Sequence, residues 1–221
     1  MDLELVSYTL CPYVQRVVIT LQHRQVPFRI TFIDLDDPPE WFLEDSPFGK
    51  VPILKVDGTT VLFESAVINE FVDEVAPGPR MLPDPPLARA VNRAWTELGS
   101  SCLGDHWDLQ SAKDARAFKR ARESLVDKLE RLEGVLGAGP YFNGASLSLV
   151  DTAFAPLFMR LAILHAIEPI FDSAELPKTA AWSRVLLGLP LVRDSVVPEF
   201  RDLYLADLRK RRGYLASRLA P

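Results

Sequence analysis

The fold of this 221-residue chain is decided by Ser7-Tyr8-Thr9-Leu10-Cys11-Pro12-Tyr13-Val14-Gln15-Arg16. Just before it, residues 2–5 alternate acidic and apolar, the period-two pattern of a half-buried strand. Residues 14–21 carry valines and a leucine at helical spacing, and Pro12 stands where the first turn of a helix tolerates proline. The sequence therefore predicts a strand before this stretch and a helix after it, with Cys11 at the junction.

Cys11 is expected at the amino end of that helix, beside backbone N–H groups that have no partner within the helix and at the positive end of its dipole. This environment lowers the pKa of a thiol and favours the thiolate, which is the reactive form. The alternative is that Cys11 is a small buried apolar residue, as most free cysteines are. This stretch alone leaves both readings open.

Residues 1 to about 75 have the pattern of a mixed α/β unit. After the first strand and helix, the expected elements are a strand at 28–32, a short helical turn at 39–43, strands at 51–56 and 60–63, and a helix at 67–75. Asp57-Gly58, between the last two strands, is a strong hairpin signal. The helical crossover makes the first two strands parallel, and the hairpin makes the last pair antiparallel.

A proline-rich segment follows, with five prolines in residues 76–86. Proline at this density allows neither helix nor sheet, so the segment predicts a stiff linker and a domain boundary. Everything after it has a helical pattern. We therefore expect a first domain at 1–76, a linker at 77–86 and an all-helical domain at 87–221, an α/β plus all-α fold.

Helices in the second domain are expected at about 118–136, 148–166, 179–187 and 199–212. Ser148, with Asp151 three residues later, is a near match to a capping box, in which aspartate replaces the usual glutamate. Residues 153–166 are apolar almost all round, which predicts the central buried helix. The basic residues 209–212 are interpreted as a solvated face at the end of the last helix.

Composition excludes several classes of function. The formal net charge of −5 argues against a nucleic-acid-binding surface. The two cysteines, Cys11 and Cys102, are far apart, which fits a reducing cytosol better than a disulfide framework. The three histidines form no motif, so no metal site is expected. No secretory signal and no membrane-spanning run are recognised, so we expect a soluble cytoplasmic protein without membrane partners.

Three segments of the first domain should converge at the carboxyl edge of its sheet. The first is Cys11. The second is Gly49-Lys50-Val51-Pro52, where proline forces Val51 into an extended conformation that can pair with a peptide-like ligand. The third is Glu64-Ser65, where a serine N-cap and the first N–H groups of a helix can receive a carboxylate.

These residues resemble a known family. Cys11-Pro12-Tyr13-Val14 is similar to the Cys-Pro-Tyr-Cys motif of glutaredoxins, with Val14 in place of the second cysteine. With Val51-Pro52, Glu64-Ser65, the proline-rich linker and the helical second half, the chain resembles the cytosolic glutathione transferases, most of all their cysteine-containing, omega-like branch. The resemblance implies a thioredoxin-like, glutathione-binding first domain with Val51-Pro52 in the cis form.

The resemblance also implies a site for glutathione as co-substrate, without a metal. Cys11 would face the glutathione sulfur, with Pro12 and Tyr13 beside it, and Val51-Pro52 would present an edge to the cysteinyl backbone. Glu64 and Ser65 would hold the γ-glutamyl end, and Lys50 would lie near the glycyl end. Each position also has a structural alternative: Pro52 starts a strand, Glu64-Ser65 caps a helix, and Lys50 is an exposed loop charge.

The second substrate, a small electrophile or disulfide, should bind between the domains. His106 and Trp107, expected in a break between two helical stretches, are weak candidates for its pocket. Arg16 is expected to be structural, paired with an acid, and Cys102 to be buried. Ser7 or Tyr8 would be the alternative group that activates glutathione.

The predicted function is a glutathione-dependent thiol transferase or dehydroascorbate reductase that acts through a mixed disulfide at Cys11. One alternative is conjugation of glutathione to an electrophile. Another is a non-catalytic interaction protein on the same fold. The resemblance further implies a homodimer, and the apolar residues at 65–75 and 87–105 would supply its interface.

Overall fold

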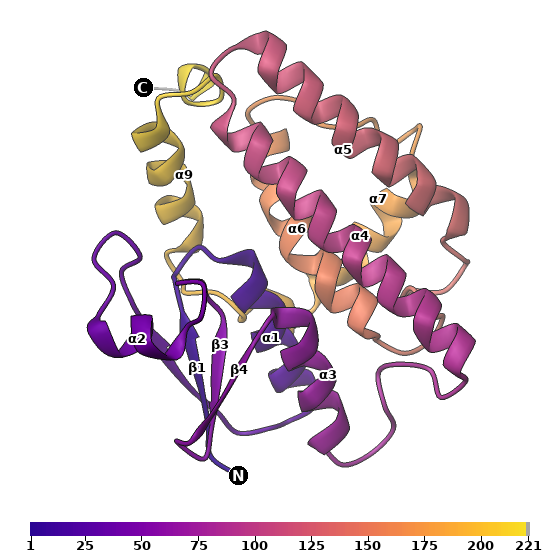
Figure 1. Ribbon diagram of the computed structural model, residues 1–221. Coiled ribbons are helices and arrows are strands. Elements are labelled where there is room, and N and C mark those ends of the chain that lie inside the picture. The colour runs from indigo at the N-terminus through magenta and orange to yellow at the C-terminus, as the bar shows by residue number, and fades with distance from the viewer. Residues whose placement is uncertain (220–221) are drawn as a thin grey trace.

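A four-stranded sheet forms the centre of the first half of the chain in the computed structural model, which describes residues 1–219 (Figure 1). The strands are β1 (Leu3–Ser7), β2 (Arg29–Phe32), β3 (Ile53–Val56) and β4 (Thr60–Phe63), in the order β2-β1-β3-β4. β1 and β2 are parallel, and the other two pairs are antiparallel. Asp57 and Gly58 turn the β3–β4 hairpin with φ of 50° and 68°. The predicted order of elements along the chain, the parallel β1–β2 pair and the antiparallel β3–β4 hairpin are confirmed.

Helices cover both faces of this sheet. They are α1 (Pro12–His23), α2 (Glu40–Asp45) and α3 (Ser65–Val75). The apolar side of α1 and residues Ile68 and Val72 of α3 pack with Leu5 and Leu54 on one face. Phe42 of α2 packs with strand residues on the other face. Because side chains alternate along a strand, the two faces take different strand residues into their cores.

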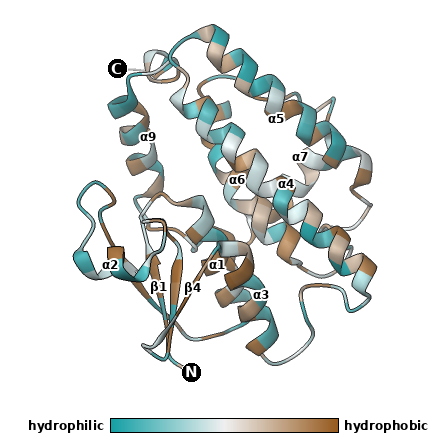
Figure 2. Ribbon diagram, in the orientation of Figure 1, coloured by the Kyte–Doolittle hydropathy of each residue, from teal (hydrophilic) through white to brown (hydrophobic). Residues whose placement is uncertain are grey.

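The second half is helical. Its elements are α4 (Pro86–Ser111), α5 (Ala115–Val135), α6 (Leu149–His165), α7 (Pro177–Gly188), α8 (Pro190–Arg193), α9 (Phe200–Arg211) and a short 3₁₀ turn, η1 (Ala216–Arg218). Hydrophilic residues are frequent on α5 and α9, whereas the strands of the sheet are largely hydrophobic (Figure 2). No helix within residues 1–219 is long and apolar enough to cross a membrane. Residues 220 and 221 of the expected second domain lie outside the described part.

α6 is the central helix of the second half, as its apolar pattern predicts. Thirteen of its residues are buried, and they lie on all sides of the helix rather than along one face. It contacts α4 on one side and α1 of the first half on another. The contact of α6 with α1 is therefore the most extensive one between helices of the two halves.

α4 is one continuous helix, so the break expected near His106 and Trp107 is wrong. Proline occurs only at its start, where the first turn accepts it. Its interior glycines do not interrupt it. A Cβ at Gly99 would lie 3.2 Å from the Phe154 ring, so this glycine lets α4 approach α6 closely, whereas a Cβ at Gly104 would meet nothing within 4 Å.

The capping box predicted at the start of α6 is confirmed. The backbone N–H and the hydroxyl of Ser148 donate to Asp151 Oδ2 at 2.7 and 2.6 Å. Asp151 Oδ1 accepts from the Phe142 N–H at 2.9 Å and from Trp182 Nε1 at 2.7 Å. One buried carboxylate therefore joins the α5–α6 connection, the start of α6 and α7.

The first prediction concerns this carboxylate. Asp151→Ala leaves buried donors of Phe142, Ser148 and Trp182 without their acceptor, each at a cost of about 1–3 kcal/mol, so the free energy of unfolding should fall by about 3 kcal/mol or more. Urea denaturation measures this loss. The matched control is Asp114→Ala, which removes the exposed N-cap of α5 and one hydrogen bond to Ala117, at a cost of about 1 kcal/mol. Equal losses for the two variants would contradict the prediction.

Candidate active site

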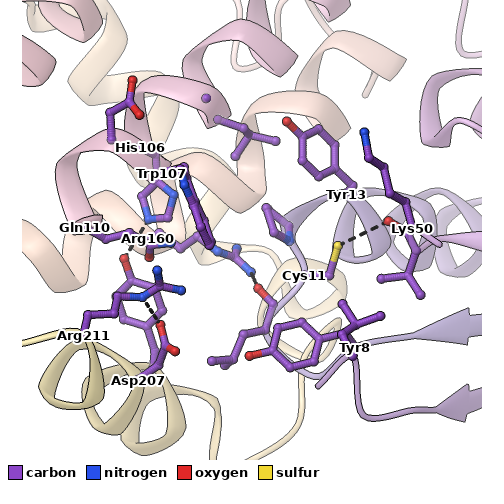
Figure 3. A pocket seen from close by; sticks show the side chains of 18 of the residues that line it. Tyr8, Cys11, Tyr13, Lys50, His106, Trp107, Gln110, Arg160, Asp207 and Arg211 are labelled. Carbon is purple, nitrogen blue, oxygen red and sulfur yellow. Dashed lines mark hydrogen bonds and ion pairs between the residues drawn. The ribbon is translucent and has the colours of Figure 1, made fainter. Parts of the chain in front are cut away.

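Cys11 lies where the sequence predicts it, between β1 and α1. It is the N-cap of α1, with extended backbone angles (φ −71°, ψ 118°), and Pro12 is the first helical residue. Its own N–H donates to the Tyr8 carbonyl at 3.0 Å, which closes the loop after β1. Its Sγ lies 3.8 Å from the carbonyl oxygen of Val51, so the first two predicted segments meet (Figure 3).

The thiol of Cys11 is subject to opposing effects. Burial raises its pKa above the ordinary value. The backbone N–H groups of Val14 and Tyr13 and the charges of Arg160 and Arg16 lower it, but burial is the largest effect and the resulting pKa is raised. The expectation that the helix terminus alone would favour the thiolate is therefore wrong. The reason is the tertiary packing of Cys11 against the core of the first half and beside Val51, which the local sequence pattern does not contain.

Cys11 opens into a cleft of about 1160 Å³ between the two halves of the molecule (Figure 3). Its walls come from the loops after β1 and β2, from the Gly49–Val51 segment, and from α4, α6 and α9. Among the predicted glutathione residues, Pro12, Tyr13, Lys50 and Val51 line it. Among residues 1–219 no group of three His, Cys, Asp or Glu side chains is placed to hold a metal ion.

The segment before β3 is shaped by its backbone. Gly49 has a φ of 59°, and the buried Ser46 hydroxyl hydrogen-bonds to both the N–H and the carbonyl of Lys50 at 2.9 and 3.0 Å. The Val51–Pro52 peptide is cis, as the resemblance implies. Pro52 is buried beneath the segment, while the exposed Lys50 and half-buried Val51 face the cleft.

The third segment differs from the expectation. Glu64, with a left-handed φ of 65°, is the N-cap of α3, and Ser65 is already inside the helix. The Ser65 hydroxyl is buried and accepts a hydrogen bond from Arg16 Nε at 2.8 Å, so it is not the predicted cap. Neither residue lines the cleft directly. The first N–H groups of α3 have no intrahelical partner, and they are what this segment offers to an anionic group.

Arg16 has structural contacts, as predicted, but the prediction that its partner is an acid is wrong. Its guanidinium donates to two serine hydroxyls, Ser65 Oγ at 2.8 Å and Ser100 Oγ at 3.0 Å. These contacts tie α1 to α3 and α4. The sequence pattern could not have identified them, because the serines lie 49 and 84 residues away along the chain.

His106 and Trp107 both line the cleft, although from a continuous helix. His106 is buried, its Nε2 lies 2.6 Å from the Tyr204 hydroxyl, and burial lowers its pKa to about 3, so it is neutral. Trp107 is 55% exposed, and the Arg211 guanidinium lies 4.3 Å from its ring centroid. The inner end of the cleft is thus a neutral hydrogen-bonded pair, and its rim is an aromatic face with a cation over it (Figure 3).

Several residues that line the cleft were not predicted from the sequence. They include Arg160 on α6 and Tyr204, Asp207, Lys210 and Arg211 on α9. A single arginine within the apolar pattern of residues 153–166 was a signal that could have identified Arg160. The basic residues at the end of α9 are not simply a solvated face, because Lys210 and Arg211 border the cleft and Arg211 pairs with Asp207 at 2.6 Å.

The other candidate groups, Ser7, Tyr8 and Cys102, differ in their access to the cleft. Tyr8 lines the cleft, and burial raises the pKa of its hydroxyl. Ser7 is buried, and its hydroxyl donates to the Tyr8 carbonyl at 3.2 Å. Cys102 is fully buried, as expected, and burial raises its pKa to about 12.

Comparison with known proteins agrees with this geometry. Residues 10–75 match the family described as glutathione S-transferase, N-terminal domain, and residues 115–184 match glutathione S-transferase, C-terminal domain. The chain is 32% identical to glutathione S-transferase omega-1 of Sus scrofa, over 90% of this chain and 84% of that protein. It is 35% identical to glutathione S-transferase DHAR2 of Arabidopsis thaliana, over 69% and 68%. Glutathione transferase Omega 3C of Trametes versicolor has a similar structure, with a TM-score of 0.80, 28% identity and coverage of 88% and 89%.

The second prediction compares the two cysteines. Iodoacetamide should label Cys11, which is partly exposed, and leave Cys102 unlabelled, because Cys102 is fully buried and its pKa is about 12. Since burial raises the pKa of Cys11, the labelling rate should rise with pH through a midpoint above the ~8.5 of a free cysteine. Intact-mass analysis of the native protein, with Cys11→Ala as control, measures both. Labelling that persists in Cys11→Ala would contradict the assignment.

Proposed function

This chain belongs to the glutathione S-transferase family and is a glutathione-dependent thiol transferase or reductase, and we propose that Cys11 carries its reaction through a mixed disulfide. The observation that supports this role is the position of Cys11. It is the N-cap of α1, it opens into the cleft between the halves, and its Sγ is beside the Val51 carbonyl. Cys102, the other cysteine, is fully buried.

Glutathione is proposed to lie along the first half of the molecule. The N–H groups at the start of α3 suit its γ-glutamyl carboxylate, and the exposed Glu64 suits its ammonium group. The backbone of Val51 suits its cysteinyl peptide group, and Lys50 suits the glycyl carboxylate. Ser65 supports this arrangement indirectly, because its hydroxyl accepts a hydrogen bond from Arg16 of α1 and so ties the start of α3 to α1.

The proposed reaction uses a single protein thiol. The Cys11 thiolate attacks the glutathionyl sulfur of a substrate disulfide, the substrate leaves as a thiolate that takes up a proton, and Cys11 is left in a mixed disulfide with glutathione. A second glutathione thiolate attacks that disulfide, releases glutathione disulfide and restores the Cys11 thiolate. When dehydroascorbate is the oxidant, its two-electron reduction is balanced by the oxidation of two glutathione molecules to the disulfide.

The second substrate is proposed to occupy the part of the cleft along α4 and α9. Trp107 offers an aromatic face there, and His106 with Tyr204 closes the inner end. Gly104 enlarges the space, because a Cβ at this position would meet no atom within 4 Å. A cleft of this size has room for glutathione together with a second molecule.

Conjugation of glutathione to an electrophile is the second candidate function. It is favoured by one observation: the Tyr8 hydroxyl lines the same cleft as Cys11. The raised pKa of Tyr8 means that this hydroxyl is a donor to a thiolate rather than a base.

We also propose that the protein is a homodimer in a reducing, cytoplasmic compartment. Large exposed apolar residues gather on the first half and the start of α4, namely Phe48, Phe63, Val67, Leu87 and Val91. Phe48 and Phe63 contact each other edge to face, at 6.1 Å between centroids, and the Glu70–Arg93 ion pair brings α3 and α4 together on this side. A patch of this kind is typical of a contact between subunits.

The third prediction tests the reacting thiol. Treatment with oxidised glutathione should add one glutathionyl group to the protein, which excess thiol removes. Cys11→Ala should lose thiol transfer and dehydroascorbate reduction by a factor of at least ~100, because no second thiol lies in the cleft. The control Cys102→Ala should keep these activities. If conjugation of an aryl halide survives in Cys11→Ala and disappears in Cys11→Ala/Tyr8→Phe, Tyr8 supports the second function.

A wild-type protein that takes up no glutathionyl group and turns over no substrate would favour the interaction-protein alternative.

The fourth prediction tests the apolar patch. Phe48→Ser should convert a dimer of about twice 24.8 kDa into a monomer at micromolar concentration, measured by sedimentation. Leu203→Ser is the matched control, because Leu203 is an exposed apolar residue on α9, outside the patch. A wild-type protein that sediments as a monomer would overturn the proposal.

A further inference from the structure

Arg160 is a buried cation without a carboxylate partner among residues 1–219. It lies on α6, is 1% exposed, and takes part in none of the ion pairs of the described chain. Its hydrogen bonds all go to neutral oxygens: Gln15 Oε1 at 2.6 Å, the Pro156 carbonyl at 2.9 Å and the Leu10 carbonyl at 2.8 Å. Its guanidinium also lies 4.9 Å from the centroid of the Phe200 ring.

A buried charge that meets only neutral groups is costly, so an opposite charge that forms beside it is stabilised. Burial lowers the pKa of Arg160 to about 10, which still leaves it protonated at neutral pH. Tyr204 and Cys11 are the two groups whose negative forms favour its charge. Burial raises the pKa of Tyr204, so its hydroxyl stays neutral. Burial raises the pKa of Cys11 as well, but Cys11 is the group proposed to ionise in the reaction, so its thiolate is the anion that Arg160 would meet.

We propose that Arg160 is a positioning residue for Cys11. Arg160 holds the loop before the thiol through its hydrogen bond to the Leu10 carbonyl, and it supplies the positive charge that stabilises the thiolate. The proposal rests on Cys11 as the reacting group of the proposed function. It assigns to the second half of the chain a direct part in the reactivity of a thiol that belongs to the first half (Figure 3).

Other charged and titratable groups line the cleft together with Cys11 or act on its neighbours Tyr13 and Arg16. They are Tyr8 in the loop after β1, Tyr13 and Arg16 on α1, Lys50 before β3, Glu64 at the start of α3, Glu97 and His106 on α4, and Tyr204 and Asp207 on α9. The tyrosines and His106 are neutral at physiological pH. Arg16, like Arg160, lowers the pKa of the thiol by its charge, and its effect is smaller than that of Arg160.

The test is the pH dependence of Cys11 alkylation by iodoacetamide, followed by intact mass. Arg160→Gln, which keeps a hydrogen-bond donor without the charge, should raise the midpoint by about one pH unit, a tenfold loss of rate at neutral pH. Arg160→Lys, which keeps the charge, should restore most of the rate. Gln15→Met removes one partner of Arg160 and leaves its charge, so its midpoint should match that of wild type.

Two outcomes would overturn the proposal. One is an unchanged midpoint in Arg160→Gln, and the other is an equal shift in Arg160→Lys, which would assign the effect to disturbed packing. Since this assay needs no turnover, its result is independent of whether the proposed enzymatic activity is found.

A second measurement needs no substitution of Arg160, in case Arg160→Gln does not fold. The Arg160 Nε–H resonance, followed by NMR across pH, should shift with the midpoint of Cys11 in the wild type and stay constant in Cys11→Ser. A resonance that does not respond to Cys11 ionisation would equally overturn the proposal.

Discussion

The burial of α1 on every side is the constraint on which the rest of the structure depends. One side of this helix is apolar and packs on the sheet together with α3. The other side carries Gln15, Arg16 and Thr20, all at most 2% exposed. Buried polar groups must be paired, so the partners of these three side chains decide where the surrounding helices can lie. Those partners come from α3, α4, α6 and the turn after α8: Ser65, Ser100, Thr152, Arg160 and Ser195.

This arrangement explains why the active site is built from both halves of the chain. Cys11 is the N-cap of α1, so whatever fixes α1 also fixes the thiol. The sheet positions it from one side through Val51 and the loop after β1. The helical half positions it from the other side through Arg160 and the Leu10 carbonyl. A change in α6 can therefore alter the reactivity of Cys11 without touching the segments that are proposed to bind glutathione.

The features that the sequence predicts correctly are those carried by local patterns. Hairpin residues, the apolar face of α1 and the Ser148–Asp151 box each depend on neighbours within a few positions, and each is confirmed. The wrong expectations concern long-range contacts. Ser65 is a partner of Arg16 rather than a helix cap, and tertiary burial raises the pKa of Cys11. The break expected near His106 and Trp107 does not occur, because α4 is continuous from Pro86 to Ser111 and packs along its length on other helices, with Gly99 against Phe154.

The distribution of charge in the cleft bears on which molecules it accepts. Its walls carry as many acidic as basic side chains, the acids being Asp34, Asp36, Asp105, Asp108 and Asp207 and the bases Lys50, Lys128, Arg160, Lys210 and Arg211. The cleft as a whole therefore does not attract anions by net charge. Asp105 is already paired with Lys128, Asp207 with Arg211, and Asp36 with Lys210, whereas Lys50 and Arg160 have no carboxylate partner among residues 1–219. Both cations line the cleft into which Cys11 opens, and Arg160 is among the charges that lower the pKa of its thiol. Arg160 therefore favours negative charge on the Cys11 sulfur, whereas the size of the cleft and the Trp107 ring would select the proposed second substrate.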